Sequence, residues 1–165
     1  MYDRQKLENN IVARTRQEQR ELAKQFSEGS RVYRKLLLLL WKHGIETKAG
    51  CSGIPSMHAE MDDCRAYVSI AVTPQNRTFL DAFVEELMCA GFDIKYRISC
   101  TVEESDKRER IIDCVQLPEN VTSMALYSYK FNRKALQTQR AKKECNKFFK
   151  TILKALQDTI KATAP

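Results

Sequence analysis

The residue types best suited to hold a metal lie in one polar stretch in the first half of the chain. Cys51, His58 and Cys64 combine two thiols with an imidazole, and such a set is chemically able to bind zinc. Their spacing, C-x6-H-x5-C, matches no standard zinc motif, and the sequence contains no C-x-x-C. A polar loop with two unrelated cysteines is therefore the favoured interpretation, and we predict that the protein holds no zinc.

A second pattern overlaps the first. His58, Ala59 and Glu60 form the H-A-E triplet in which zinc deaminases use the histidine as a ligand and the glutamate to move protons. Those sites also need a downstream P-C-x-x-C, which this sequence lacks. A G-x-S-x-G nucleophile turn and the glycine-rich phosphate loops are absent as well. We assign no catalytic residue and expect no cofactor, and a zinc-dependent enzyme centred on His58 is the third of our functional hypotheses.

Positive charge is unevenly distributed along the sequence. The net charge is +7, and residues 131–165 carry nine Lys and Arg against two Asp and Glu. Residues 45–130 are acidic by contrast, with nine basic and fourteen acidic side chains. A basic surface confined to part of a protein is typical of one that meets phosphate groups or an acidic protein. The alternative is a solvated face with no partner.

The basic C-terminal segment has the periodicity of an amphipathic helix. One side of its helical wheel is apolar and contains Cys145, Phe148, Phe149, Ile152, Leu153, Leu156 and Ile160. The opposite side is cationic and contains Arg140, Lys143, Lys147, Lys150, Lys154 and Lys161. Because the apolar side is needed for packing, a membrane partner is not expected. The cationic side is suited to neutralise the phosphates of a nucleic acid, which releases counterions.

A group of aromatic residues precedes that helix. Tyr127, Tyr129 and Phe131 alternate along a predicted strand, with Lys130 between them and Arg133 just after. Aromatic side chains on a sheet beside cations stack on the bases of single-stranded nucleic acids and hold them. The alternative is that the rings pack beneath a helix.

The elements that must position these residues follow from apolar periodicity and from turn signals. Helices are predicted over residues 3–28, 31–43, 74–90 and 132–162, and strands over 45–50, 66–72, 92–102, 110–117 and 122–131. We expect the last three strands to form an antiparallel meander. This order predicts an α+β fold, a mostly antiparallel sheet of four to five strands covered by helices, with a long N-terminal helix and a long basic C-terminal helix.

The first predicted helix carries only a thin apolar stripe, formed by Leu7, Ile11, Leu22 and Phe26 and interrupted around Thr15. Such a helix has little to bury. We therefore predict an N-terminal helical extension over residues 1–29 and a single α+β domain over residues 30–165. Self-association through residues 3–28 is part of the same hypothesis.

The six cysteines are widely spaced, and the first thirty residues are charged rather than apolar. We therefore expect a cytoplasmic protein whose cysteines, Cys100 and Cys145 among them, are free and buried, with no disulfide framework. The longest apolar run, residues 36–41, is too short to span a bilayer.

Together these patterns favour a non-enzymatic, nucleic-acid-binding accessory protein that uses its basic C-terminal helix. The alternative is a protein-binding adaptor or inhibitor, of the kind found among accessory proteins of phages and mobile elements, that docks on a partner's acidic surface. A continuous basic groove would favour nucleic acid, whereas exposed apolar residues beside the cations would favour a protein partner.

Overall fold

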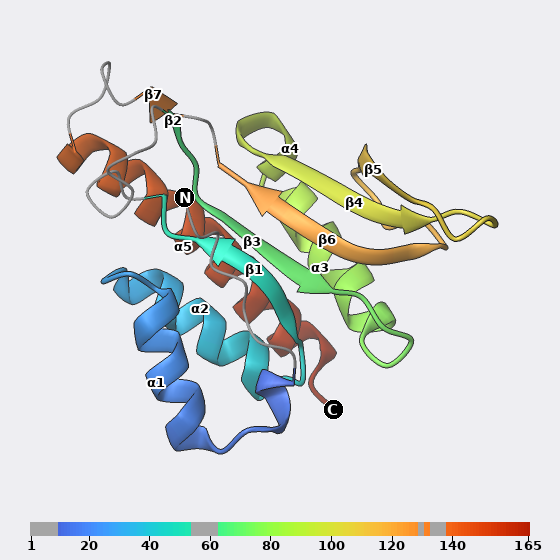
Figure 1. The fold of residues 1–165 in the computed structure, drawn as a ribbon, viewed down its shortest axis with the longest axis horizontal. Helices are drawn as coiled ribbons and strands as arrows, with labels where there is room; N and C mark the ends of the chain where they lie inside the picture. Colours follow the sequence, from blue (N-terminus) through green and yellow to red (C-terminus); the bar gives the residue numbers. More distant parts are fainter. Residues whose placement is uncertain (1–9, 54–62, 129–130, 133–137) are drawn as a thin grey trace.

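The computed structural model describes residues 10–53, 63–128, 131–132 and 138–165 (Figure 1). A 3-10 turn, η1 (Ile11–Ala13), precedes the helices α1 (Arg16–Phe26), α2 (Arg31–Lys42), α3 (Arg77–Cys89), α4 (Phe92–Lys95) and α5 (Thr138–Thr163). The strands are β1 (Thr47–Cys51), β2 (Asp63–Cys64), β3 (Tyr67–Ala71), β4 (Arg97–Glu103), β5 (Glu109–Asp113), β6 (Val121–Tyr127) and β7 (Phe131–Asn132).

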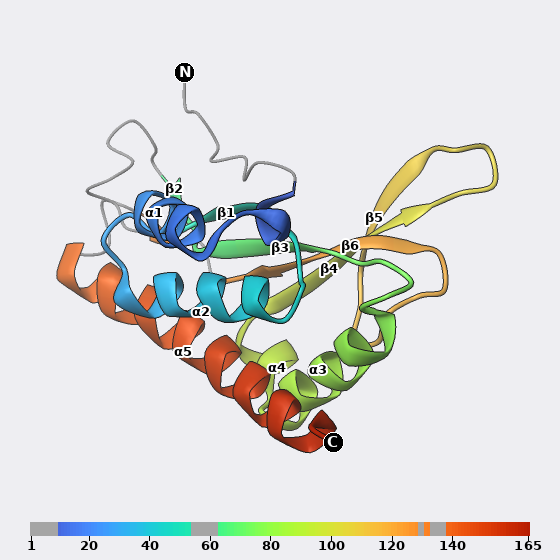
Figure 2. The ribbon, with the colours of Figure 1, turned by 90° about the horizontal axis from the view of Figure 1, so that it is seen from below.

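Five of the strands form one antiparallel sheet in the order β1-β3-β6-β4-β5. Helices α2, α3, α4 and α5 lie together on one face of this sheet, and α1 packs against α2 (Figure 2). Among the described residues, no helix covers β3, β6, β4 and β5 from the opposite face. The strands β2 and β7 pair separately, beyond the end of β3 and β6 (Figure 1). The predicted α+β class is confirmed.

The core lies between the inner face of the sheet and the helix layer. Alternate residues of the strands point into it, such as Val68 and Ile70 of β3 and Met124 and Leu126 of β6, all of them fully buried. The helices supply the larger side chains: Tyr33, Leu36, Leu37, Leu40 and Trp41 from α2, Leu80, Phe83 and Leu87 from α3, and Phe148, Phe149, Ile152 and Leu156 from α5.

The N-terminal segment differs from the single long helix predicted over residues 3–28. In its described part, which starts at residue 10, the turn η1 and the helix α1 are separate elements. Thr15 caps α1, because its hydroxyl accepts a hydrogen bond from the backbone N–H of Glu18 and donates one to the Glu18 carboxylate. This N-cap by Thr15 starts a new helix at Arg16 and explains the break.

The same segment also buries more than its apolar stripe predicts. Ile11 and Ala23 are fully buried and Phe26 is 7% exposed, and all three belong to the core cluster. Glu46, just before β1, fixes η1 because its carboxylate accepts hydrogen bonds from the backbone N–H groups of Ile11 (2.6 Å) and Val12 (3.2 Å). The division into an extension and a domain at residue 29 stays a prediction.

Residues 92–95 form the short helix α4, and not the start of the strand predicted over residues 92–102. Gly91 precedes α4 with a φ of 72°, a left-handed conformation that glycine adopts without strain. The buried ring of Phe92 contacts Tyr96 four residues later, with centroids 5.0 Å apart, as on one helical turn. Ile94 is 81% exposed. The alternation of apolar residues in the sequence continues across the boundary between α4 and β4. The strand was therefore predicted to start at residue 92, whereas β4 starts at Arg97.

The last three strands of the main sheet do not form the predicted meander. β4 pairs with both β5 and β6, and β6 pairs also with β3. β6 is an inner strand with buried Met124 and Leu126, whereas β5 lies at the edge with four of its five residues exposed. An inner position between β3 and β4 suits the apolar β6, and an edge position suits the charged β5.

Cys100 and Cys114 form a disulfide, so the expectation that Cys100 is a free thiol is wrong. The hairpin register brings the two together: Cys100 lies opposite Ile112 of β5, and the backbone N–H of Cys114 donates to the carbonyl oxygen of Ile98 at 3.2 Å. Strand register sets this pairing, and the spacing of cysteines along a sequence does not reveal it. Cys51, Cys89 and Cys145 are not disulfide-bonded.

Candidate nucleic-acid interface

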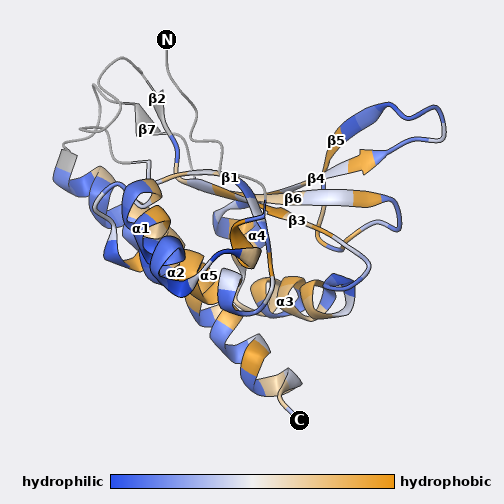
Figure 3. Cartoon of the chain, turned by 60° about the horizontal axis from the view of Figure 1, so that its bottom comes forward, coloured by the Kyte–Doolittle hydropathy of each residue, from blue (hydrophilic) through white to orange (hydrophobic). Residues whose placement is uncertain are grey.

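The closing helix α5 separates apolar and charged residues onto two sides. Its apolar side faces the core: Cys145, Phe148, Phe149, Ile152, Leu153 and Leu156 are buried, and Ile160 is half-buried. On the opposite side, Arg140, Lys143, Lys147, Lys150, Lys154 and Lys161 are all exposed. Hydrophobic and hydrophilic patches alternate along α5 accordingly (Figure 3). The described part of the helix spans Thr138–Thr163, and Asn132, at which the helix was predicted to begin, belongs to the strand β7. Neither α5 nor any other described helix is long and apolar enough to cross a membrane.

The exposed cations of α5 form a row along the helix axis. Steps of three and four residues lead from Arg140 to Lys154, a length of about 21 Å at 1.5 Å per residue. Two members of the row pair with acidic neighbours on the same helix, Lys147 with Glu144 at 3.9 Å and Lys154 with Asp158 at 2.9 Å. Exposed pairs of this kind contribute only about 0–1 kcal/mol. In the described part of the chain, the other members of the row lie in no ion pair, so the row is available to an external anion.

Helix α2 adds cations that the periodicity of α5 alone does not reveal. It packs beside α5 beneath the sheet (Figure 2) and contains no acidic residue. Its Arg31, Lys35 and Lys42 are exposed, on the side opposite the buried Leu36 and Leu40. We call the exposed cations of both helices the basic helical face: Arg31, Lys35, Lys42, Arg140, Lys143, Lys147, Lys150, Lys154 and Lys161.

Tyr127 belongs to a different surface, the outer face of the sheet. At the end of β6 it stands opposite Tyr67 of β3 and Arg97 of β4. The two tyrosine rings stack with centroids 5.6 Å apart, and the guanidinium of Arg65 lies 5.0 Å from the Tyr127 ring centroid. Sequence reasoning missed Tyr67 and Arg65, because only the register of β3 against β6 brings them to Tyr127. Of the other residues predicted for this group, Phe131 lies in the separate strand β7, opposite Cys64, and not in one strand with Tyr127. Tyr129, Lys130 and Arg133 lie outside the described residues.

The two predicted groups therefore lie on opposite sides of the sheet. The cations of α5 are exposed on the side of the helix opposite its buried residues, whereas Tyr127 alternates with the buried Leu126 of β6 and therefore stands on the outer face. Helix α5 itself lies on the inner side of the sheet (Figure 2). The first turns of α5, which carry Arg140 and Lys143, lie toward the end of the sheet where β2 pairs with β7 (Figure 1). Tyr127 is also at this end of the sheet. A ligand that contacts both the cations of α5 and Tyr127 must therefore pass around this end of the sheet.

The structure assembles no metal site from the residues that it describes. Cys51 ends β1 and is 4% exposed, and Cys64 belongs to β2. His58, the third residue of the candidate zinc set, and Glu60 of the H-A-E triplet lie outside the described residues. Within the described ranges, no group of three His, Cys, Asp or Glu side chains could hold a metal ion. The zinc hypothesis stays a prediction.

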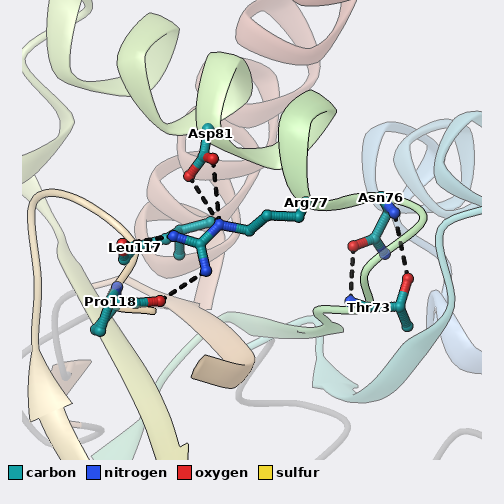
Figure 4. A network of polar contacts seen from close by, with 6 residues as sticks. All are labelled: Thr73, Asn76, Arg77, Asp81, Leu117 and Pro118. Carbon is teal, nitrogen blue, oxygen red and sulfur yellow. Dashed lines mark hydrogen bonds and ion pairs between the residues drawn. The ribbon is translucent and has the colours of Figure 1, made fainter. Parts of the chain in front are cut away.

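A cavity of about 390 Å³ lies between α3 and the connection from β5 to β6. Arg77 lines it, but the guanidinium of Arg77 is already engaged (Figure 4). Its Nε donates to the Asp81 carboxylate, and its Nη1 and Nη2 donate to the backbone carbonyl oxygens of Pro118 (2.7 Å) and Leu117 (2.8 Å). These contacts hold the β5–β6 connection against α3, and we assign the cavity no ligand.

The start of α3 is fixed by a reciprocal pair of hydrogen bonds (Figure 4). The backbone N–H of Thr73 donates to the Asn76 side-chain carbonyl at 2.8 Å, and the backbone N–H of Asn76 donates to the Thr73 hydroxyl at 3.2 Å. Asn76 is thus the residue before the helix, which begins at Arg77 and not at residue 74 as predicted.

Tyr33 contributes a buried hydroxyl beneath β1. The side chain is fully buried, and its ring stacks on Phe149 with centroids 4.3 Å apart. Its hydroxyl has no hydrogen-bond partner among the described residues. Burial, together with the nearby Cys51 and Glu28, raises the pKa of Tyr33 well above its usual value. The group is neutral at ordinary pH and serves packing, so we assign it no catalytic role.

Comparison with protein-family models, curated proteins and solved structures finds no match to this chain.

Proposed function

We propose that the protein binds nucleic acid without catalysing a reaction on it, and that the basic helical face contacts the phosphates. The observation that carries this proposal is the separation, on α5, of a buried apolar side from an exposed row of cations. The apolar side is already used by the core, and the fold makes no use of most of the cations. α2 adds exposed cations beside them with no acidic residue.

A phosphate backbone suits this row because its charges also repeat at short intervals. Cations three or four residues apart on a helix recur about every 5 Å along the axis. Each neutralised phosphate releases counterions, which makes the affinity fall as salt rises. Phosphate contacts position a nucleic acid but do not read its sequence. We therefore propose binding that depends strongly on salt and little on sequence.

The second candidate is a protein-binding adaptor or inhibitor that presents the same cations to an acidic partner. It is favoured by three exposed apolar side chains, Ile94 (81%), Ile111 (69%) and Val115 (60%). Ile111 lies on the edge strand β5, and Val115 lies in the connection that follows it. These two positions are away from α5 (Figure 1), which is the reason that we place this candidate second.

The test is the reversal of Lys143, Lys147, Lys150 and Lys154 to Glu in one protein. Fluorescence anisotropy with labelled single- and double-stranded DNA and RNA, at two salt concentrations, measures binding. The wild-type protein should bind at low salt, with a log-log slope of about −0.7 to −0.9 per phosphate contact. The reversed protein should lose binding and keep its fold, because all four side chains are exposed.

A matched control reverses four exposed cations elsewhere: Arg16, Arg20 and Lys24 of α1, and Lys107 of the β4–β5 turn. It makes the same change in net charge, and it should retain most of the binding. Equal losses in both variants would show that only the net charge matters. If the wild-type protein binds none of the four probes at low salt, the nucleic-acid proposal is wrong and the adaptor becomes the leading candidate.

The cytoplasm stays our proposed location, supported by the three described cysteines that form no disulfide, Cys51, Cys89 and Cys145. The Cys100–Cys114 disulfide argues for an oxidising compartment instead, since disulfides persist there. The two locations differ in the redox state of this pair inside the cell, which is measured by lysing cells directly into denaturant that contains a thiol reagent and no reductant. In a cytoplasmic protein Cys100 and Cys114 should be reduced in the cell and therefore labelled, and the disulfide should form only on oxidation after lysis. Labelling that requires a reductant would contradict this location.

A further inference from the structure

The outer face of the sheet carries a row of three side chains that are adjacent in space but come from three different strands. Tyr67, Tyr127 and Arg97 are register partners on β3, β6 and β4. In an antiparallel sheet, partners opposite each other project from the same face. Both tyrosines are half-buried and Arg97 is exposed, so the row reaches solvent.

The two tyrosines form one extended aromatic surface with a cation on it. Their rings stack at 5.6 Å with an angle of 29° between planes. The guanidinium of Arg65 lies 5.0 Å from the Tyr127 centroid, within the range of a cation–π contact. Flat aromatic rings and arginine planes are the two kinds of side chain on which unstacked bases stack in single-strand recognition.

The charge around this row is suited to an anionic chain. Arg97 pairs with Asp113 at 2.6 Å, but both side chains are more than half exposed, so this pair is weak and accessible. The neighbouring outward positions toward the centre of the sheet are small, namely Ser69 of β3, Ala125 of β6 and Ser99 of β4. Ser69 and Ala125 are half-buried, so on β3 and β6 no large side chain stands beside the rings, whereas Ser99 is 4% exposed.

We propose that Tyr67, Tyr127 and Arg65 form a stacking platform for the bases of single-stranded nucleic acid. This inference rests on the proposed function and specifies its ligand. Bases in a duplex are already stacked on one another, so only an unpaired strand can offer them to this platform. The platform lies at the end of the sheet toward which α5 begins (Figure 1), and a strand held here can extend its phosphates toward Arg140 and Lys143.

The test compares three labelled probes of equal length in the wild-type protein: a single-stranded oligonucleotide, the same backbone with abasic sites, and a duplex. The single strand should bind several-fold more tightly than the abasic strand, because only the former offers bases for stacking. DNA and RNA versions of the single strand show whether the sugar matters. This comparison needs no variant, so it decides the matter even if a substitution disturbs the fold.

Substitutions then locate the platform. Tyr127→Leu and Tyr67→Leu should each weaken single-strand binding by about 5- to 100-fold, the range typical for loss of one base–aromatic contact. Abasic and duplex binding should be nearly unchanged. Tyr127→Phe is the matched control, because it keeps the ring and removes only the hydroxyl, and it should retain the preference for single strands. Circular dichroism checks that each variant is folded.

The platform and the proposed function fail in different ways. If the wild-type protein binds single and abasic strands equally, or if the folded leucine variants keep the full preference, then the platform is wrong. Binding that is still lost on reversal of the α5 lysines would leave the proposed function standing. No binding of any probe would overturn both.

Discussion

The hydroxyl of Tyr33 on α2 occupies the space in which a side chain on Gly50 of β1 would begin. Two further atoms crowd the same position, the ring carbon Cζ of Tyr33 at 3.1 Å and the backbone carbonyl oxygen of Tyr67 at 3.2 Å. Gly50 therefore serves close packing, which requires the absence of a Cβ. The ring that fills this space continues into the stack with Phe149 of α5, so Gly50 lets α2 and α5 approach the sheet together.

The first prediction is a rescue between these two residues. Gly50→Ala should lower the free energy of unfolding by about 1–3 kcal/mol, because the new methyl group overpacks the core. Tyr33→Phe should cost little, since the hydroxyl has no hydrogen-bond partner to lose among the described residues. The double variant should recover part of the loss. Urea unfolding of all four proteins measures this, and effects that simply add within about 0.5 kcal/mol would contradict the contact.

The second prediction concerns alkaline pH. The folded-state pKa of Tyr33 is raised, first by burial and then by Cys51 and Glu28, above its unfolded value near 10. The contribution of protonated Tyr33 to the free energy of unfolding is therefore fully present below pH 10. It is lost as the pH rises above that value, because there the unfolded chain releases the phenol proton of Tyr33 while the folded chain keeps it. The slope from this group approaches about 1.4 kcal/mol per pH unit. Urea unfolding from pH 8 to 11 should show a steeper decline for wild type than for Tyr33→Phe. Parallel declines would show that Tyr33 does not titrate differently on unfolding.

The third prediction concerns zinc. Protein purified under reducing conditions should contain far less than one zinc per chain by mass spectrometry, because the spacing of Cys51, His58 and Cys64 fits no standard motif. Cys51 is also buried at the end of β1. One zinc per chain, lost on His58→Ala but retained in His43→Ala, would be the opposite result and would revive the enzyme hypothesis.

Much of the fold could be predicted from the sequence because its main elements are strongly periodic. The two sides of α5 follow from 3.6-residue spacing, and β3 follows from the alternation of Val68 and Ile70 with Ser69. Two local signals mark boundaries that the periodicity does not: Thr15 can cap a helix within the predicted first helix, and Gly91 precedes α4.

The candidate sites were less predictable, because they depend on which elements become neighbours. Tyr67 and Tyr127 are sixty residues apart in sequence and meet only through the register of β3 and β6. The packing of α2 beside α5 likewise brings Lys35 and Lys42 to the basic helical face. Long-range pairing of this kind is set by the packing of the whole chain, and period-two or 3.6-residue patterns carry no information about it.

The fourth prediction concerns the disulfide. Cys100 and Cys114 close a loop of 14 residues, for which loop entropy predicts a stabilisation of about 3 kcal/mol. The variant with both residues changed to Ser should be less stable than oxidised wild type by up to this amount. Reduced wild type should also lose stability. Cys89→Ser is the control, because Cys89 is free and exposed, and its stability should match wild type. Equal stability of oxidised and reduced wild type would contradict a stabilising disulfide.

The last prediction tests whether residues before Gly29 are an independent extension. Ile11 is fully buried and Phe26 is 7% exposed in the common core, so Ile11→Ala should cost about 2–5 kcal/mol and Phe26→Ala about 3–5 kcal/mol. Gln25→Ala on the exposed side of α1 should change stability by less than about 0.5 kcal/mol. Glu46→Gln should also destabilise, since it weakens the acceptor for the N–H groups of Ile11 and Val12. Chemical unfolding should give one transition for every variant. If Ile11→Ala and Phe26→Ala instead leave the main transition unchanged, the segment folds apart from residues 30–165, and the division at residue 29 is correct.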